Sequence, residues 1–230
     1  MRAGNGDLLK PDVIAPGQDI LAGVAPPGNA GNLFNLYSGT SMSSPHVAGL
    51  AALLKDLHPD WSPMAIKSAL MTSGSDVLDG PNTNPLVIFR QGAGHVRPNR
   101  AADPGLVFDS GINDWLAFLC GTTTGVSPAT CSALAGLGYS FDPSNLNVAS
   151  IAIGDLLSAQ AVTRRVSGQP GFDHVEPGAV RVLQRQLHAD HGRAERIQRW
   201  PIDLERRHPQ RPRPHGHPSF GAGGAGGRLG

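Results

Sequence analysis

Apolar residues recur at helical spacing in one stretch of the first half of the chain. Val47, Leu50, Ala51 and Leu54 lie three or four positions apart, which places them on one face of a helix. Serine and threonine residues cluster immediately before them, as is common where a helix begins. The pattern predicts a helix over residues 40–57 whose apolar face is mostly buried.

A second helix is expected directly afterwards. His58 and Pro59 end the first helix, and Ser62 followed by Pro63 is the combination that favours an N-cap and a first helical residue. Gly74 is a plausible end. The apolar face of this second helix would consist of Ile66, Leu70 and Met71.

The chain divides into three stretches by pattern. Residues 1–102 alternate short apolar runs with glycine and proline and contain both helices, which predicts an α/β domain. Residues 103–166 predict a short helix around Trp115–Leu119, then a loop, then the start of a small β-rich domain. The strand prediction rests on two short alternating pairs, Leu146 with Val148 and Ile151 with Ile153. The alternation changes phase between them, near residues 149–150, which suggests a bulge or a break.

Residues 167–230 have a different composition. They contain no Lys, Thr, Asn, Tyr, Met or Cys, and arginine, histidine, proline and glycine dominate. Such a segment has too few apolar residues to offset the loss of chain entropy, so we expect a disordered tail. Its abrupt start and its composition also fit a gene read in the wrong frame after the codon of Val166.

Charge and cysteine content exclude some classes of protein. The formal net charge of +1 argues against a strongly basic nucleic-acid-binding protein, and aromatic residues are too sparse in the tail for single-strand stacking. The start of the chain shows no export signal, and the longest apolar run, residues 47–54, is too short to span a bilayer. Cys120 and Cys131 are compatible with a local disulfide or with two free thiols.

The candidate chemistry lies in residues 39–49, Gly-Thr-Ser-Met-Ser-Ser-Pro-His-Val-Ala-Gly. A serine at the start of a helix has free amide groups and the positive end of the helix dipole beside it, where an oxyanion can be stabilised. In an arbitrary sequence the serines would only cap the helix. Because Ser43 rather than glycine stands two residues after Ser41, the segment is not the nucleophile elbow of a lipase.

This segment matches the nucleophile motif of the subtilisin-like serine proteases residue for residue, with Ser41 in the nucleophile position. The resemblance covers roughly residues 5–166 and is closest to the plant-type, cucumisin-like branch. Further matching segments are residues 10–17, 58–63, 92–96, 98–107 and 114–120. It implies that residues 1–102 are the C-terminal part of a three-layer α/β peptidase domain, with Gly39, Thr40 and Met42 around the oxyanion region. It also implies a secreted protein that acts on proteins or peptides.

The rest of the catalytic machinery is not recognisable. In the subtilisin order the Asp and the His precede the serine, yet residues 1–40 contain no histidine. The available acids, Asp7, Asp12 and Asp19, lack the family's Asp-Thr-Gly or Asp-Ser-Gly context. The family's oxyanion asparagine lies well upstream of the serine, so Asn29, Asn32 and Asn35 do not match it. His46, five residues along the helix, is interpreted as a packed structural histidine, and His95 likewise as structural.

The sequence therefore predicts part of a serine endopeptidase that is inactive alone and needs a separate or preceding protease segment as a partner. The alternative is a non-catalytic remnant or interaction protein with an unspecific basic tail. No cofactor is expected; calcium is possible in the full-length family, but no calcium or other metal site can be assigned here. His215 and His217 near the end would bind metal only weakly.

Overall fold

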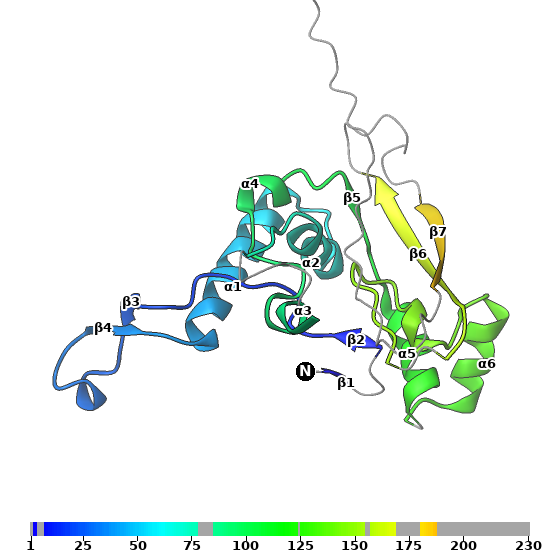
Figure 1. Ribbon diagram of the computed structural model, residues 1–230, viewed down its shortest axis with the longest axis horizontal. Helices are drawn as coiled ribbons and strands as arrows, with labels where there is room; N and C mark the ends of the chain where they lie inside the picture. The colour runs from blue at the N-terminus through cyan, green and yellow to red at the C-terminus, as the bar shows by residue number, and fades with distance from the viewer. Residues whose placement is uncertain are drawn as a thin grey trace, which may run out of the picture.

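The computed structural model describes residues 2–3, 7–77, 85–123, 125–154, 157–168 and 180–187. It combines helices with small antiparallel sheets. Figure 1 shows the helices of residues 40–101 near the centre, those of residues 112–136 to the right, and a hairpin projecting to the left. This mixture of helices and strands is consistent with the predicted α/β class. The helices are α1 (Thr40–Leu57), α2 (Pro63–Thr72), α3 (Pro85–Gln91), α4 (Pro98–Ala101), α5 (Ile112–Thr122), α6 (Pro128–Gly136) and the 3-10 turns η1 (Pro26–Gly28) and η2 (Pro143–Asn145).

Three antiparallel sheets account for the strands in the described part of the chain. The first pairs β1 (Arg2–Ala3) with β2 (Leu8–Leu9), and the second pairs β3 (Ile20–Gly23) with β4 (Phe34–Tyr37). The third has the order β5 (Leu106–Val107), β6 (Gln160–Gly168) and β7 (Val180–Leu187). Within the described part of residues 1–102, parallel pairing is limited to one bridge between Ile14 and His95.

Helix α1 has the predicted bounds, but its apolar face is less buried than the spacing suggests. Leu54 is its buried residue, and Val47, Leu50 and Ala51 pack part-buried against the core. Leu53 remains 66% exposed. The prediction of a mostly buried apolar face is therefore wrong: Leu54 alone is buried, and α1 also carries apolar side chains on faces that stay exposed.

Helix α2 forms as the sequence predicts. The Ser62 hydroxyl accepts hydrogen bonds from the amides of Met64 and Ala65, at 3.1 and 3.0 Å, and Pro63 is the first helical residue. The helix ends at Thr72, two residues before Gly74. The core around it consists of Leu54, Trp61, Ala65, Ile66, Ala69, Leu70, Val96, Ala101 and Val107.

Residues 10–14 are joined to α2 and to residues 92–96. Asp12 forms ion pairs with Lys10 and with Lys67, the latter at 3.1 Å. Burial lowers the pKa of Lys67, and the charge of Asp12 acts in the opposite direction. His95 exchanges backbone hydrogen bonds with Ser75, at 3.0 and 2.7 Å, beside its bridge to Ile14. These contacts support the structural interpretation of His95.

Cys120 and Cys131 form a disulfide that joins α5 to α6, which decides between the two alternatives left open by the sequence. Helix α5 is longer than the predicted segment around Trp115–Leu119. Asp114 in its first turn accepts a hydrogen bond from the Gly111 amide at 2.8 Å and pairs with Arg165 of β6.

The strand expected over residues 146–153 is wrong. Leu146, Val148 and Ile151 are buried as their alternation suggests, but this stretch is irregular backbone. The reason is a side chain: the Arg164 guanidinium donates hydrogen bonds to the carbonyls of residues 144, 148 and 150, at 2.7, 2.9 and 3.0 Å. These carbonyls thus have partners without a neighbouring strand.

The predicted boundary at residue 167 also differs from the structure. Strand β6 runs to Gly168, and Val180–Leu187 pairs antiparallel with it as β7. The sequence of β7 alternates valines with polar residues at its start, which suits a strand, so disorder over all of 167–230 is too broad a prediction. Residues 169–179 and 188–230, the remainder of the expected tail, lie outside the described residues.

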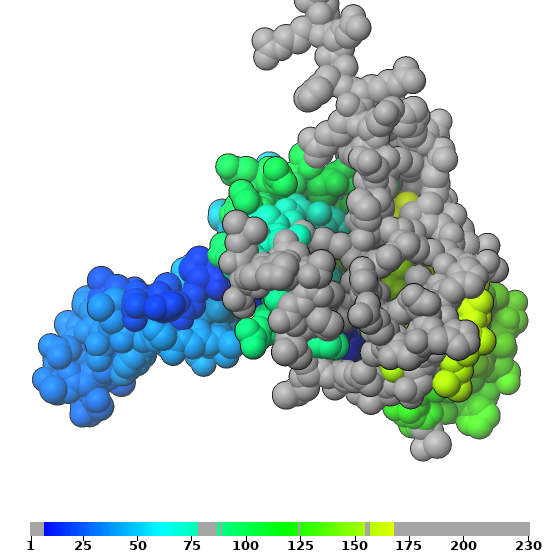
Figure 2. Space-filling view, in the orientation of Figure 1, coloured from blue at the N-terminus to red at the C-terminus, as the bar shows by residue number. Residues whose placement is uncertain are grey.

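The β3–β4 hairpin forms an arm that extends away from the helices (Figure 2). Its register pairs Leu21 with Leu36 and Gly23 with Phe34, so Leu21, Leu36 and Phe34 share one face. Their exposures are 68%, 58% and 65%. On the rest of the arm, Asn29 accepts hydrogen bonds from Tyr37 at 2.6 Å and from Asn35 at 2.9 Å. The arm therefore holds its shape through its own hydrogen bonds and leaves an apolar face in solvent.

Candidate active site

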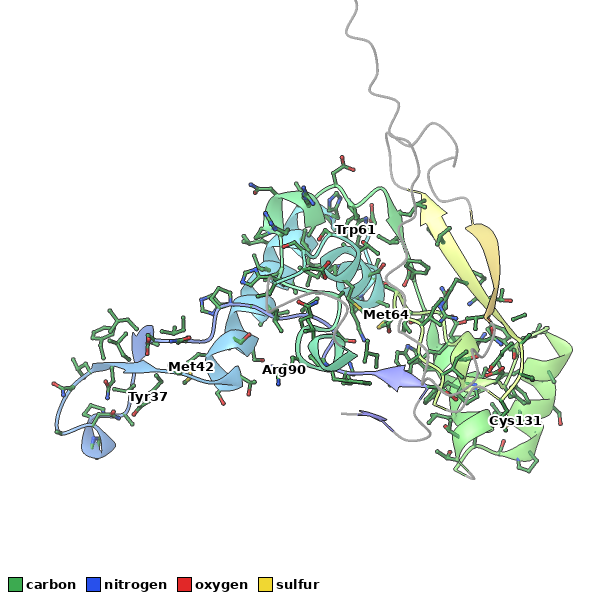
Figure 3. The ribbon with its side chains drawn as sticks, in the orientation of Figure 1. Tyr37, Met42, Trp61, Met64, Arg90 and Cys131 are labelled. Atoms are coloured by element: carbon green, nitrogen blue, oxygen red, sulfur yellow. A yellow bond between two sulfur atoms is a disulfide. The ribbon has the colours of Figure 1, made fainter. Side chains whose placement is uncertain are left out.

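Ser41 is the second residue of α1, directly after the arm returns to the body of the molecule. Figure 3 shows Met42 near the start of this helix, at the base of the arm that carries Tyr37. Gly39 is the N-cap, with φ of 155°, a conformation that favours glycine. Gly39, Thr40 and Ser41 are exposed, whereas Met42 is half-buried.

Ser41 itself has unbonded polar groups at the start of the helix. No side chain caps the helix, and within the described residues neither the amide nor the hydroxyl of Ser41 makes a hydrogen bond. Pro45 lies inside the helix, so it cannot donate the usual hydrogen bond to the Ser41 carbonyl. The Ser41 amide is therefore available to an oxygen atom that develops negative charge, at the end of the helix where the dipole favours it.

The hydrogen bond of the histidine nearest in sequence goes to a backbone carbonyl and not to the serine hydroxyl. The His46 ring donates from Nδ1 to the Met42 carbonyl, four residues back on the same helix, at 2.8 Å. The ring is exposed, so the expectation that it is packed is wrong: the side of α1 that carries it has no covering element in the described part of the chain. Its hydrogen bond nonetheless agrees with the interpretation that His46 is not the base.

The upstream acids are engaged elsewhere. Asp7 accepts a hydrogen bond from the Gly154 amide at 2.7 Å, and Asp12 pairs with Lys10 and Lys67. Asp19 accepts from the Ser38 hydroxyl at 3.1 Å, at the base of the arm. None of these contacts aligns a carboxylate with an imidazole.

The asparagines of the arm have structural partners as well. The side chain of Asn35 donates to that of Asn29 at 2.9 Å, and the backbone amide of Asn32 donates to the backbone carbonyl of Asn29, also at 2.9 Å. Together with the acids, they leave the described residues up to 40 without a base or an oxyanion side chain in place beside Ser41.

Two contacts beside Ser41 were not foreseen from the sequence. The Gly39 amide donates to the Gly17 carbonyl at 2.7 Å, and the Ser43 hydroxyl donates to the Ala15 carbonyl at 3.0 Å. Gly17 stands in an Ala-Pro-Gly segment whose turn-forming residues are the only local signal. The pairing with residues 39–43 depends on the tertiary fold.

No group of three or more His, Cys, Asp or Glu that could hold a metal ion occurs among the described residues. No step below depends on a metal. Nor does the described part of the chain contain a helix long and apolar enough to cross a membrane.

Comparisons with known proteins agree on one group of relatives. The profile of the Subtilase family, Peptidase_S8, matches residues 3–94. Subtilisin-like protease SBT2.5 of Arabidopsis thaliana is 45% identical over 186 residues, which is 71% of this chain and 23% of the relative. SBT1.7 of the same plant is 44% identical over 187 residues, 72% of this chain and 24% of the relative. The chain thus spans about a quarter of the length of the curated relatives it matches.

Proposed function

The chain belongs to the subtilase family, and from this premise we propose that Ser41 is the nucleophile of a serine endopeptidase that cleaves proteins or peptides. The observation that carries the proposal is the position of Ser41 at the start of α1, exposed and with an unbonded amide. Gly39, Thr40 and Met42 form its surroundings.

The proposed reaction is acyl transfer. The Ser41 hydroxyl attacks the carbonyl carbon of the scissile peptide bond while a histidine takes its proton, and the Ser41 amide donates to the oxyanion of the tetrahedral intermediate. The histidine then gives the proton to the leaving amine, which leaves an acyl-enzyme on Ser41. Water then attacks the carbonyl carbon of this ester while the histidine takes its proton. The histidine returns the proton to the Ser41 oxygen, which releases the acid product.

On this proposal, a subtilase segment other than residues 1–40 supplies three further groups. These are the histidine, its orienting aspartate and a second oxyanion donor. An unassisted serine hydroxyl is a weak nucleophile at neutral pH, and a triad acts as a unit. Residues 1–230 taken alone are therefore inactive on this proposal, and that subtilase segment completes the active enzyme.

The proposal also includes a division of the chain into domains and a secreted location. Residues 1–102 are the C-terminal part of a three-layer α/β peptidase domain, which residues 103–166 follow as the beginning of a β-rich domain; the match over residues 3–94 and the β5–β6–β7 sheet support this division. The Cys120–Cys131 disulfide supports a secreted protein, because disulfides persist in oxidising compartments.

The test is labelling with a fluorophosphonate, a reagent that reacts with activated serines. The full chain would be assayed alone and co-expressed with a subtilase segment that carries the Asp, His and Asn of that family's active site. We expect labelling and peptide cleavage only in the co-expressed pair, and neither after Ser41→Ala. Ser44→Ala, an exposed serine on the same turn, serves as the matched control and should leave both signals unchanged.

Two results would contradict the proposal. Labelling of the chain alone would mean that it contains a base, with His46 the first residue to mutate. Equal labelling of the pair before and after Ser41→Ala would place the reactive serine elsewhere.

A further inference from the structure

We propose that Gly17 and Ser43 are positioning residues that hold Ser41 in reactive geometry by fastening the start of α1 to residues 15–17. The inference rests on the proposed function of Ser41, and it concerns two residues outside the nucleophile and oxyanion set. The two contacts that carry it are the Gly39 amide on the Gly17 carbonyl at 2.7 Å and the Ser43 hydroxyl on the Ala15 carbonyl at 3.0 Å. We call this pair of contacts the brace.

The two contacts of the brace lie on either side of the nucleophile in the chain. Gly39 lies two residues before Ser41 and Ser43 two residues after it, so both flanks are tied to one extended segment. Ser43 could instead have bonded back to its own helix, as serines in helices often do. Its hydroxyl crosses to Ala15, which is 28 positions away in the chain.

The first turn of α1 needs an outside support because its own hydrogen bonds are few. The helix has no side-chain cap, and Pro45 provides no donor for the Ser41 carbonyl. The amides of Met42 and Ser43 both converge on the Gly39 carbonyl, at 3.1 and 3.3 Å. The orientation of the turn therefore depends on where Gly39 is held.

Gly17 is suited to this task by the absence of a side chain. A Cβ there would lie 2.8 Å from the Gly39 carbonyl oxygen and 3.1 Å from the Ser43 Cβ. Neither neighbour is the end of a flexible side chain, so alanine at position 17 must displace the backbone at Gly39 or the helix at Ser43. Either displacement moves Ser41, which lies between them.

The chemistry makes such a displacement costly. Ser41 must present its hydroxyl to the base and its amide to the oxyanion at the same time, and a misplacement of about 1 Å can lower a rate by roughly 100-fold. The brace does not touch the substrate. Loosening it should therefore lower kcat while KM remains nearly constant, because interactions made in the transition state are lost and ground-state binding is not.

The experiment uses the full chain in the co-expressed pair described above, with variants in matched sets. Gly17→Ala is compared with Gly28→Ala, because a Cβ at Gly28 meets nothing within 4 Å. Ser43→Ala is compared with Ser44→Ala, and Ser43→Thr restores the hydroxyl. Rates of peptide cleavage provide kcat and KM, and amide hydrogen exchange over residues 38–44 reports whether each variant retains the turn.

We expect Gly17→Ala to lower kcat by roughly 100-fold and Ser43→Ala by about 10-fold, with KM within about twofold of wild type. Ser43→Thr should recover most of kcat, and both controls should match wild type. Gly17→Ala should also speed exchange at Gly39, whereas Gly28→Ala should not.

Every other outcome decides against the inference. If wild type is active and Gly17→Ala or Ser43→Ala is equally active, the positioning role is wrong while the proposed function stands. If these variants raise KM and leave kcat unchanged, they act on substrate binding and not on Ser41. If the wild-type pair is inactive, the proposed function fails, and the positioning role falls with it.

Discussion

Replacing Arg164 should destabilise the C-terminal part of the described structure more than any other single change of a charged residue there. Arg164 is 2% exposed on β6, between the buried Val162 and Val166. Burial lowers its pKa to about 10, against the opposing charge of Asp142, so the guanidinium is still charged at neutral pH. Its hydrogen bonds go to backbone carbonyls, at residues 144, 148, 150 and 163.

The magnitude follows from these carbonyls. In Arg164→Met, three carbonyls outside β6 lose their donor, and each buried acceptor left unpaired costs roughly 1–3 kcal/mol. Part of this loss in the free energy of unfolding is offset, because removing the buried charge also removes its desolvation penalty. We expect a net loss of about 3 kcal/mol. Arg164→Lys should lose about 2 kcal/mol, since a single ammonium cannot reach three separated carbonyls as the planar fork does.

Native-state hydrogen exchange provides the assay. The amides of Thr163 and Arg165 donate to the side chains of Asn145 and Asn147, both at 2.7 Å, and so report on the loop that Arg164 holds. A loss of 3 kcal/mol should speed their exchange by about 100-fold. Arg100→Met, at an exposed position, is the control and should change exchange by less than about threefold.

The reasoning is refuted if Arg164→Met exchanges within about threefold of wild type at both amides. It is also refuted if Arg164→Lys is as stable as wild type, because a point charge would then replace the guanidinium geometry.

Three further predictions concern other parts of the molecule. In the active pair, peroxide should lower turnover by oxidising Met42 beside the nucleophile, and Met42→Ala should resist it; equal sensitivity of both would reject this. The double variant Phe34→Ser/Leu36→Ser should lower the binding of a hydrophobic dye to the chain, and unchanged fluorescence would show that the arm is covered. Burial lowers the pKa of Lys67 below 10.5, so between that lowered pKa and 10.5 the unfolded chain binds more protons than the folded chain. The free energy of unfolding, measured by urea titration, should therefore rise with pH through this window. In Lys67→Met this slope should be lost.

Local patterns were sufficient to predict the two central helices and the place of Ser41. The spacing of Val47, Leu50 and Leu54 and the Ser62–Pro63 start depend on contacts within a few residues, and α1 and α2 have the predicted starts. The motif around Ser41 likewise needs no distant partner to be recognised. The family followed from these residues, and the comparisons confirm it.

The tertiary structure decided everything that depends on residues far apart in the chain. It joined Cys120 to Cys131 and brought Gly17 against Gly39, neither of which a local pattern could distinguish from its alternatives. It also made residues 146–153 a loop and not a strand, since alternation reports burial, whereas a strand needs a partner for its carbonyls, and Arg164 took that role. Periodicity is a short-range property that the sequence itself contains; hydrogen bonds such as those of Arg164, whose partners lie 14 or more positions away, exist only once the chain is folded.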